Sequence, residues 1–158
     1  MKKLLIILPI LTLATGCATQ QTNCKKSASD HCGKRVVRTT AYTHTEPGGR
    51  KNAIGTRLSC GQVKSAASDW SRFPLGTKFK ILTTGEIRRI DDYGSALVGT
   101  NTIDLYKTTR GDMRTWGVRH VDIEILEWGS AEESLRILTP RARNSHVRSM
   151  IADLRRQT

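Results

Sequence analysis

The feature that most limits the fold of this chain is a series of short β-prone segments between residues 35 and 126, each separated from the next by a turn. The segments are rich in Val, Ile, Thr, Phe and Tyr, and residues 120–126 alternate between apolar and charged side chains. No long helical period precedes Ser130. This pattern predicts an all-β domain, a small closed barrel with strands at residues 35–42, 63–68, 78–82, 86–90, 102–106 and 120–126.

Two helices are expected beside the barrel. Residues 108–116 form the only helix-like segment inside the β-rich region. Near the C-terminus, Asn144 or Ser145 can cap a helix whose apolar positions recur at helical spacing, at Val147, Met150, Ile151 and Leu154. The opposite face of this amphipathic helix carries arginines, at Arg148, Arg155 and Arg156. Such a helix either packs on the barrel or lies on an anionic membrane.

Residues 1–16 have the pattern of a lipoprotein signal peptide. Lys2 and Lys3 precede an apolar run at residues 4–13 that is too short to span a bilayer as a helix. The small residues before Cys17 resemble a lipobox, which makes Cys17 the lipidated first residue of the mature chain; in the alternative, an ordinary signal peptide merely precedes it. By resemblance to lipoproteins of Gram-negative bacteria, Ala18 leaves sorting to the outer membrane open. We expect an exported protein anchored by lipid on the periplasmic face of that membrane.

The remaining chain divides into three parts. Residues 17–34 are small and polar and are expected to be a flexible tether, residues 35–128 the barrel, and residues 129–158 a basic, helical C-terminal extension. Cys24, Cys32 and Cys60 are left once Cys17 is lipidated, and one disulfide or unpaired thiols both remain open. The cysteines lack the Cys-x-x-Cys spacing of a zinc knuckle, so no metal or other cofactor is expected.

The charge of the chain indicates an acidic partner. It has 26 Lys and Arg against 14 Asp and Glu, a net charge of +12. Nucleic acid, anionic lipid and cell-wall polymer all fit this charge. Aromatic residues make up only 5% of the chain and do not alternate with basic ones, so nucleic acid is not expected as a partner.

Candidate chemistry gathers in residues 90–106. We expect Gly94 and Gly99 to let this segment bend and carry Asp92 back towards Asp104, so that the two carboxylates share a cleft. Like charges held close raise the pKa of one carboxyl, which is a way to keep a proton donor near neutral pH. The ordinary alternative is that these are turn residues, with Asp91 a solvated neighbour.

Several stretches, in order, resemble the three-aspartate (3D) domain, which is also the catalytic barrel of the membrane-bound lytic transglycosylase A family. Thr40-Ala41-Tyr42 resembles its opening strand, and residues 67–77 resemble its first aspartate, Asp69, with the following Pro-Leu-Gly-Thr turn. Residues 92–99 and 103–106 resemble the segments of the second and third aspartates, Asp92 and Asp104. The resemblance covers about residues 36–126.

The resemblance implies a double-psi β-barrel that cleaves peptidoglycan glycan strands and forms a 1,6-anhydro-muramyl product. It implies that Asp104 is the single acid/base, that Asp92 raises the pKa of Asp104 or stabilises the transition state, and that Asp69 supports them. Substrate contacts are expected from Thr40, Tyr42, Gly94, Ser95 and Gly99. We expect a monomer, and the alternative function is a cell-envelope lipoprotein that binds peptidoglycan without cutting it.

Overall fold

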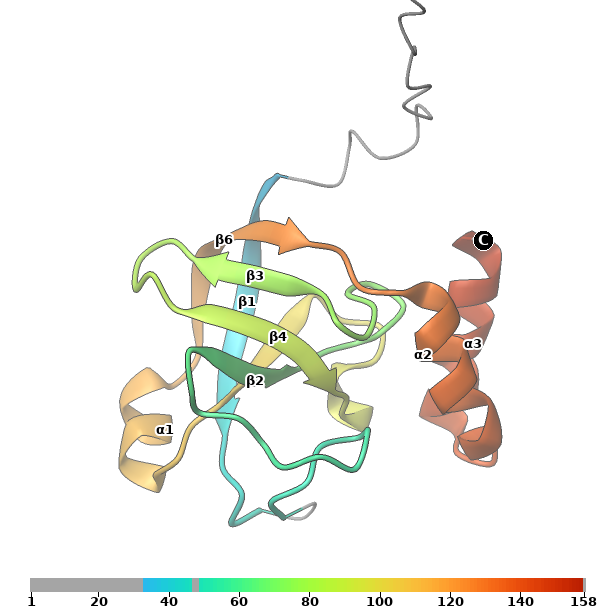
Figure 1. Ribbon diagram of the computed structural model, residues 1–158, viewed down its shortest axis with the longest axis horizontal. Helices are drawn as coiled ribbons and strands as arrows, with labels where there is room; N and C mark the ends of the chain where they lie inside the picture. The colour runs from blue at the N-terminus through green and yellow to red at the C-terminus, as the bar shows by residue number, and fades with distance from the viewer. Residues whose placement is uncertain (1–32, 47–48, 158) are drawn as a thin grey trace, which may run out of the picture.

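The computed structural model describes residues 33–46 and 49–157 and shows a closed six-stranded β-barrel (Figure 1). Its strands are β1 (Lys34–Tyr42), β2 (Val63–Ala67), β3 (Lys78–Ile81), β4 (Ile87–Asp92), β5 (Thr102–Tyr106) and β6 (Arg119–Glu127). All six predicted strands are confirmed, with ends shifted by no more than two residues. The predicted signal peptide, Cys17, Cys24, Cys32 and nearly all of the predicted tether lie outside the described residues.

The strands follow one another around the barrel in the order β1-β5-β2-β4-β3-β6. The pairs β1/β5 and β2/β4 are parallel, and the other neighbours are antiparallel. The order has an internal symmetry in which β1 corresponds to β4, β2 to β5 and β3 to β6. Under this exchange the parallel pair β1/β5 becomes the parallel pair β4/β2, and the antiparallel pair β1/β6 becomes the antiparallel pair β4/β3. The two equivalent halves, β1–β3 and β4–β6, each contribute one strand to each parallel pair, which agrees with the predicted double-psi barrel.

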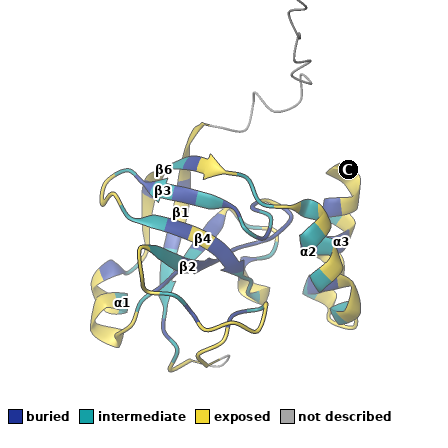
Figure 2. Cartoon of the chain, viewed as in Figure 1, coloured by how far each residue is buried: buried dark blue, intermediate teal, exposed yellow. Residues whose placement is uncertain are grey.

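The barrel interior is the apolar core. Every second residue of the strands points inward, as the period-two pattern requires. The inward residues are almost fully buried in β1, β3, β4, β5 and β6, at Val37, Phe79, Ile81, Ile90, Ile103, Leu105, Ile123 and Ile125 (Figure 2). The outward residues of β1 and β5 are thereby left free to form a site on the other face of the sheet.

Three α-helices accompany the barrel. α1 (Arg110–Trp116) confirms the predicted inserted helix and begins at Thr109, whose side chain accepts a hydrogen bond from the backbone N–H of Asp112. α2 (Ala131–Leu138) and α3 (Ser145–Gln157) lie beside each other, across the barrel from α1 (Figure 1). α3 confirms the predicted C-terminal helix, and α2 lies in the same extension, which was expected to be helical, but was not predicted as a separate helix.

The apolar face of α3 belongs to the core of the protein. Val147, Met150, Ile151 and Leu154 are at most 7% exposed and join the same buried cluster as the barrel residues. Of the two arrangements left open for this helix, packing on the barrel is therefore the observed one. Within the described residues, no helix has the length and apolarity needed to cross a membrane.

The C-terminal helices dock on the Pro-Leu-Gly-Thr turn of residues 74–77. Gly129 passes so close to this turn that a Cβ there would lie 2.2 Å from the carbonyl oxygen of Leu75. The buried hydroxyl of Ser134, in α2, accepts a hydrogen bond from the backbone N–H of Leu75 at 2.9 Å. A motif that resembles part of a catalytic domain thus also holds the C-terminal extension against the barrel.

Candidate active site

Four neighbouring strands carry a row of residues that includes two of the three predicted aspartates. Across β1, β5, β2 and β4, Thr40 pairs with Asp104, Asp104 with Ala67, and Ala67 with Asp92. Paired residues point to the same face of a sheet, and two strand spacings put the two aspartate backbones roughly 10 Å apart. Asp104 and Asp92 therefore flank the small side chain of Ala67 on the face opposite the barrel core.

This face opens into a cleft of about 250 Å³. Asp92 and Asp104 both line it, so the structure brings together the two carboxylates that the sequence suggested would share a site. Of the expected substrate contacts, Tyr42, Gly94 and Ser95 also line the cleft, whereas Thr40 and Gly99 do not. Ala67 forms its floor between the carboxylates, and Lys51 and Glu46 come from the loop after β1.

Asp104 is held by the neighbouring strand. The hydroxyl of Thr40 donates a hydrogen bond to Oδ1 of Asp104 at 2.6 Å. Burial raises the pKa of Asp104; the Thr40 hydrogen bond and Arg38 lower it, while the charge of Glu46 raises it further. Thr40 is therefore a positioning residue behind the carboxyl.

Asp92 ends β4 just after a β-bulge. The pairing passes from Ala66–Ile90 to Ala67–Asp92, which leaves Asp91 as the extra residue. Burial is the main reason why the pKa of Asp92 is raised to about 6. The hydrogen bond from the backbone N–H of Tyr93 lowers this pKa, and the charge of Asp91 raises it further. Burial is the largest cause of the raised pKa of both aspartates. That the charge of Asp92 also raises the pKa of Asp104 stays a prediction.

Asp91 is not the solvated neighbour that the sequence suggested. It is 2% exposed, and its Oδ2 accepts hydrogen bonds from Ser65 at 2.6 Å and from Asn52 at 3.0 Å. Burial raises its pKa, and its Oδ1 has no hydrogen-bond partner among the described residues. Through Asn52, Asp91 ties β4 to the loop between β1 and β2 that borders the cleft.

Tyr42 brings a hydroxyl close to all three carboxyls. Burial raises the pKa of Tyr42, and the charges of Asp92, Asp91 and Asp104 raise it further, so this phenol stays protonated. Its oxygen is buried and has no hydrogen-bond partner within the described part of the chain. The protein therefore holds an uncommitted hydrogen-bond donor at the wall of the cleft.

Asp69 lies outside the lining of the cleft and holds its border. It is 1% exposed; one carboxylate oxygen accepts bonds from the backbone and hydroxyl of Ser71, and the other accepts one from the N–H of Gly99 at 2.7 Å. Gly99 has a φ of 79°, in the left-handed region that favours glycine. Gly94, in contrast, has an extended φ of −136°, so the expectation of a special backbone angle is right at Gly99 and wrong at Gly94.

The segment that follows β2 and the C-terminal extension both hold the backbone around Asp92. The indole N–H of Trp70 donates to the carbonyl oxygen of Asp92 at 2.8 Å, and the ring packs edge-on against Tyr93. Arg141 donates to the Tyr93 hydroxyl at 3.4 Å and to the carbonyl of Ala53 at 2.8 Å, and its charge lowers the pKa of Asp92. The C-terminal extension therefore supports the site from outside the barrel.

Sequence reasoning missed Ala67, Asp91 and Arg141. Ala67 was visible as the residue before the Ser-Asp of the first motif, but only the register shows that it lies between two carboxylates. In the described ranges no three His, Cys, Asp or Glu side chains are grouped so as to hold a metal ion. Cys60 is exposed and has no disulfide within those ranges.

Comparison with known proteins gives one partial similarity. No family model matches the sequence. The chain is 32% identical over 94 residues to the cell wall-binding protein YocH of Bacillus subtilis (strain 168). The aligned region is 58% of this chain and 32% of that protein, so the chain spans about a third of its relative.

Proposed function

We propose that this protein acts at the bacterial cell wall, with the cleft as its binding site for glycan strands. Two observations support the location. A protein named for binding the cell wall is similar over more than half of the chain, and the N-terminus has the pattern of an export signal. The net charge of +12 suits an anionic wall polymer.

We further propose that the cleft cleaves the glycan as lytic transglycosylases do, in line with the resemblance to the three-aspartate domain. The supporting observation is the row in which Asp104 and Asp92 flank Ala67 in one cleft. A protonated carboxyl needs a site that disfavours its charge, and burial raises the pKa of both aspartates.

In the proposed reaction Asp104 is the single acid and base. Its carboxyl proton passes to the glycosidic oxygen as the bond from that oxygen to C1 breaks. The resulting carboxylate then takes the proton of the 6-hydroxyl of the same sugar while O6 forms a bond to C1, which closes the 1,6-anhydro ring and restores the acid. Water is not consumed, so no second carboxylate is needed to activate it.

The other cleft residues act on charge and position. Asp92 in its ionised form stabilises the positive charge that develops at C1, and its pKa of about 6 makes this form the main one at neutral pH. Tyr42 lines the cleft and contacts the sugar there, while its buried hydroxyl lies behind the surface. Ala67 leaves the space in which the ring lies between the carboxyls.

The test is release of anhydromuropeptides from purified sacculi by the mature protein, followed by mass spectrometry. An Ala67→Leu variant should fill the floor of the cleft and abolish release, whereas Ala131→Leu, a substitution of the same size in α2, should retain it. Wild-type protein that is folded and releases no anhydro product would refute the catalytic proposal.

The second candidate is a wall-binding module that does not cut the glycan, which the name of the similar protein favours. It predicts that the wild type co-sediments with sacculi and that Ala67→Leu weakens co-sedimentation, with no product from either. The two candidates therefore differ in product formation alone, while absence of binding to sacculi would contradict both.

A further inference from the structure

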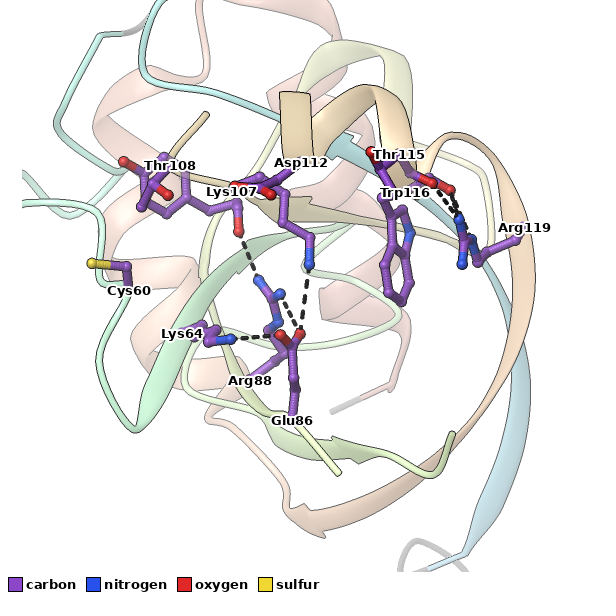
Figure 3. A pocket seen from close by; sticks show the side chains of 11 residues that line it. Cys60, Lys64, Glu86, Arg88, Lys107, Thr108, Asp112, Thr115, Trp116 and Arg119 are labelled. Atoms are coloured by element: carbon purple, nitrogen blue, oxygen red, sulfur yellow. Dashed lines mark hydrogen bonds and ion pairs between the residues drawn. The ribbon is translucent and has the colours of Figure 1, made fainter. Parts of the chain in front are cut away.

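A second cavity, lined by basic residues, lies at the other end of the sheet from the aspartate cleft. It has a volume of about 530 Å³ and is bordered by β2, β4, β5 and α1 (Figure 3). Its lining has four cations, two carboxylates and two aromatic rings: Lys64, Arg88, Lys107, Arg119, Glu86, Asp112, Tyr106 and Trp116. We call this cavity the basic pocket.

Positive charge is in excess in the basic pocket. Glu86 is shared by three cations: Lys64 at 2.5 Å, the fully buried Arg88 at 2.5 Å, and Lys107 at 3.8 Å. Burial pushes the pKa of Glu86 upward, but the hydrogen bonds from Lys64 and Arg88 and the charges of Arg88 and Lys107 outweigh it and hold the pKa at about 2. Glu86 is therefore ionised and still neutralises only one of its three partners.

Lys107 is the least satisfied of these cations. Its distance of 3.8 Å to Glu86 is too long for a hydrogen bond, and its other contact is with the face of Trp116, 4.6 Å from the ring centroid. Figure 3 shows Lys107 and Arg119 on either side of that ring. Arg119 donates to the carbonyl oxygens of Thr115 and Trp116, whereas the ammonium of Lys107 makes no hydrogen bond to any residue in the described ranges. Burial and the charges of Arg88 and Lys64 lower the pKa of Lys107, although Glu86 and Asp112 act in the opposite direction. An anion beside Lys107 would therefore relieve an unfavourable charge.

A third hollow, of about 430 Å³, has lining residues in common with both the basic pocket and the aspartate cleft. This hollow shares Leu58 with the cleft and shares Cys60, Tyr106 and Thr108 with the basic pocket. Arg50 and Arg57 line it between the two ends. Arg50 and Arg57 therefore add positive charge between the basic pocket and the cleft.

We propose that the basic pocket is a binding site for an oxyanion, a carboxylate or a phosphate, with Lys107 and Lys64 as its main contacts. Lysine ammonium groups hold such oxygens as point charges with up to three donors each. The arginines between the two sites suggest that the anion is a substituent of the same polymer whose glycan lies in the cleft, and this last step rests on the proposed function.

The anion site can be tested without any wall material. N-acetylglycine serves as the carboxylate probe and inorganic phosphate as the phosphate probe, each titrated into ¹⁵N-labelled protein while the indole N–H of Trp116 and the amide of Lys107 are followed by NMR. We expect saturable shifts at these two signals. Saturation by one probe alone identifies that anion as the ligand chemistry, and absence of saturation by both overturns the proposal.

Variants separate a built site from general attraction to a basic protein. Lys107→Gln should weaken binding of the active probe about tenfold or more, since a hydrogen bond to a charged group contributes roughly 1.5–3 kcal/mol. Lys80→Gln, which removes one positive charge from β3 outside the pocket, should leave the dissociation constant unchanged. Equal weakening in the two variants would show that only net charge matters and would refute the site.

A third variant should tighten binding. Glu86→Gln removes the carboxylate that competes with the ligand for the lysines, so the dissociation constant should fall, and the probe should raise the melting temperature of this variant more than that of the wild type. The link to the polymer has its own readout, because Lys107→Gln should reduce co-sedimentation with sacculi. Normal co-sedimentation together with lost probe binding would leave the anion site standing and refute its part in wall binding.

Discussion

The aspartate cleft and the basic pocket both contain partly buried carboxyl groups, at opposite ends of the same strands. β4 supplies Arg88 to the pocket and Asp92 to the cleft, roughly 13 Å apart along an extended strand. In the cleft, burial raises the pKa of Asp92 to about 6; in the pocket, burial acts in the same direction on Glu86, yet its pKa is held at about 2.

The partners explain this difference. Glu86 has three cations within 4 Å, whereas the nearest partners of Asp104 and Asp92 are a threonine hydroxyl and a backbone N–H. Neutral donors offset only part of the cost of burying a carboxylate, but cations more than offset it. One end of the barrel therefore suits proton transfer, and the other suits holding a charge.

The largest effect is expected from Asp104→Asn, which tests whether the cleft transfers protons. Asn keeps an oxygen that accepts the Thr40 hydrogen bond, so the fold should survive. A positioned acid/base contributes about a hundred- to ten-thousand-fold, and anhydromuropeptide release should fall by that factor while binding to sacculi changes little.

The matched control for this variant is Asp122→Asn, which removes an exposed carboxylate from β6. It should cleave at the wild-type rate. If Asp104→Asn, shown to be folded by circular dichroism, also kept that rate, the single-acid mechanism would be wrong.

Glu86→Gln tests the other end of the comparison through stability. Removing this charge leaves Arg88, which is 0% exposed, without its ion pair. We expect a loss of about 2–3 kcal/mol in the free energy of unfolding, at or below the low end of the 3–5 typical of buried pairs, because Glu86 keeps some contact with water and Gln can still accept a hydrogen bond.

The stabilisation that Glu86 provides should depend on pH in a defined direction. The pKa of Glu86 is about 2 in the folded protein and 4.5 in the reference state, so its stabilisation is complete above pH 4.5 and is lost as the pH falls towards 2. Urea unfolding across this range should therefore show the difference between wild type and variant shrinking with acid. Glu127→Gln, which breaks the exposed pair with Lys78, should cost less than about 1 kcal/mol.

The sequence predicted the barrel better than the sites, for a physical reason. Strand positions follow from local alternation and turns, and all six strands lie where that pattern indicates. α2 was not predicted as a separate helix because its eight residues make only about two turns, too few for its apolar positions to establish a helical period. It also docks partly through the hydroxyl of Ser134.

Register and long-range pairing decide the sites, and the sequence does not contain them in readable form. Asp92 and Asp104 were identified, but that Asp91 is buried follows from a bulge opposite Ala66 and Ala67. The basic pocket was missed entirely, since Glu86, Lys64 and Lys107 come from separate strands or their ends and meet only in the closed barrel. Such pairings cost loop-closure entropy that no local pattern reports.

Asp92→Asn should have a smaller effect on the free energy of unfolding than Glu86→Gln, and it should stabilise the protein rather than destabilise it. The pKa of Asp92 is higher in the folded protein, about 6, than its reference value of 3.8, so its charge destabilises the fold increasingly as the pH rises from about 4 to 6. Asn retains an acceptor for the N–H of Tyr93 and removes that charge. The variant should be more stable than the wild type at pH 7.5, by roughly 1–3 kcal/mol, and should lose this advantage at pH 4. Equal stability at both pH values would show that the cleft does not penalise charge.

The smallest effect separates the two glycines that border the cleft. Gly99 has a φ of 79°, and its N–H donates to Asp69, so Gly99→Ala must place a side chain in a left-handed backbone and should cost about 1 kcal/mol or more. Gly94 is extended, and an added Cβ would meet only Leu97 at 3.5 Å, an ordinary contact. Gly94→Ala should therefore leave the free energy of unfolding within about 0.5 kcal/mol of the wild type.

Glycan binding should show the opposite order, because Gly94 lines the cleft and Gly99 does not. Gly94→Ala narrows the cleft and should weaken binding more than Gly99→Ala, which acts only through its loop. Urea unfolding and co-sedimentation with sacculi measure the two rankings, and the same order in both would mean that the loop, rather than the space beside Asp92, limits binding.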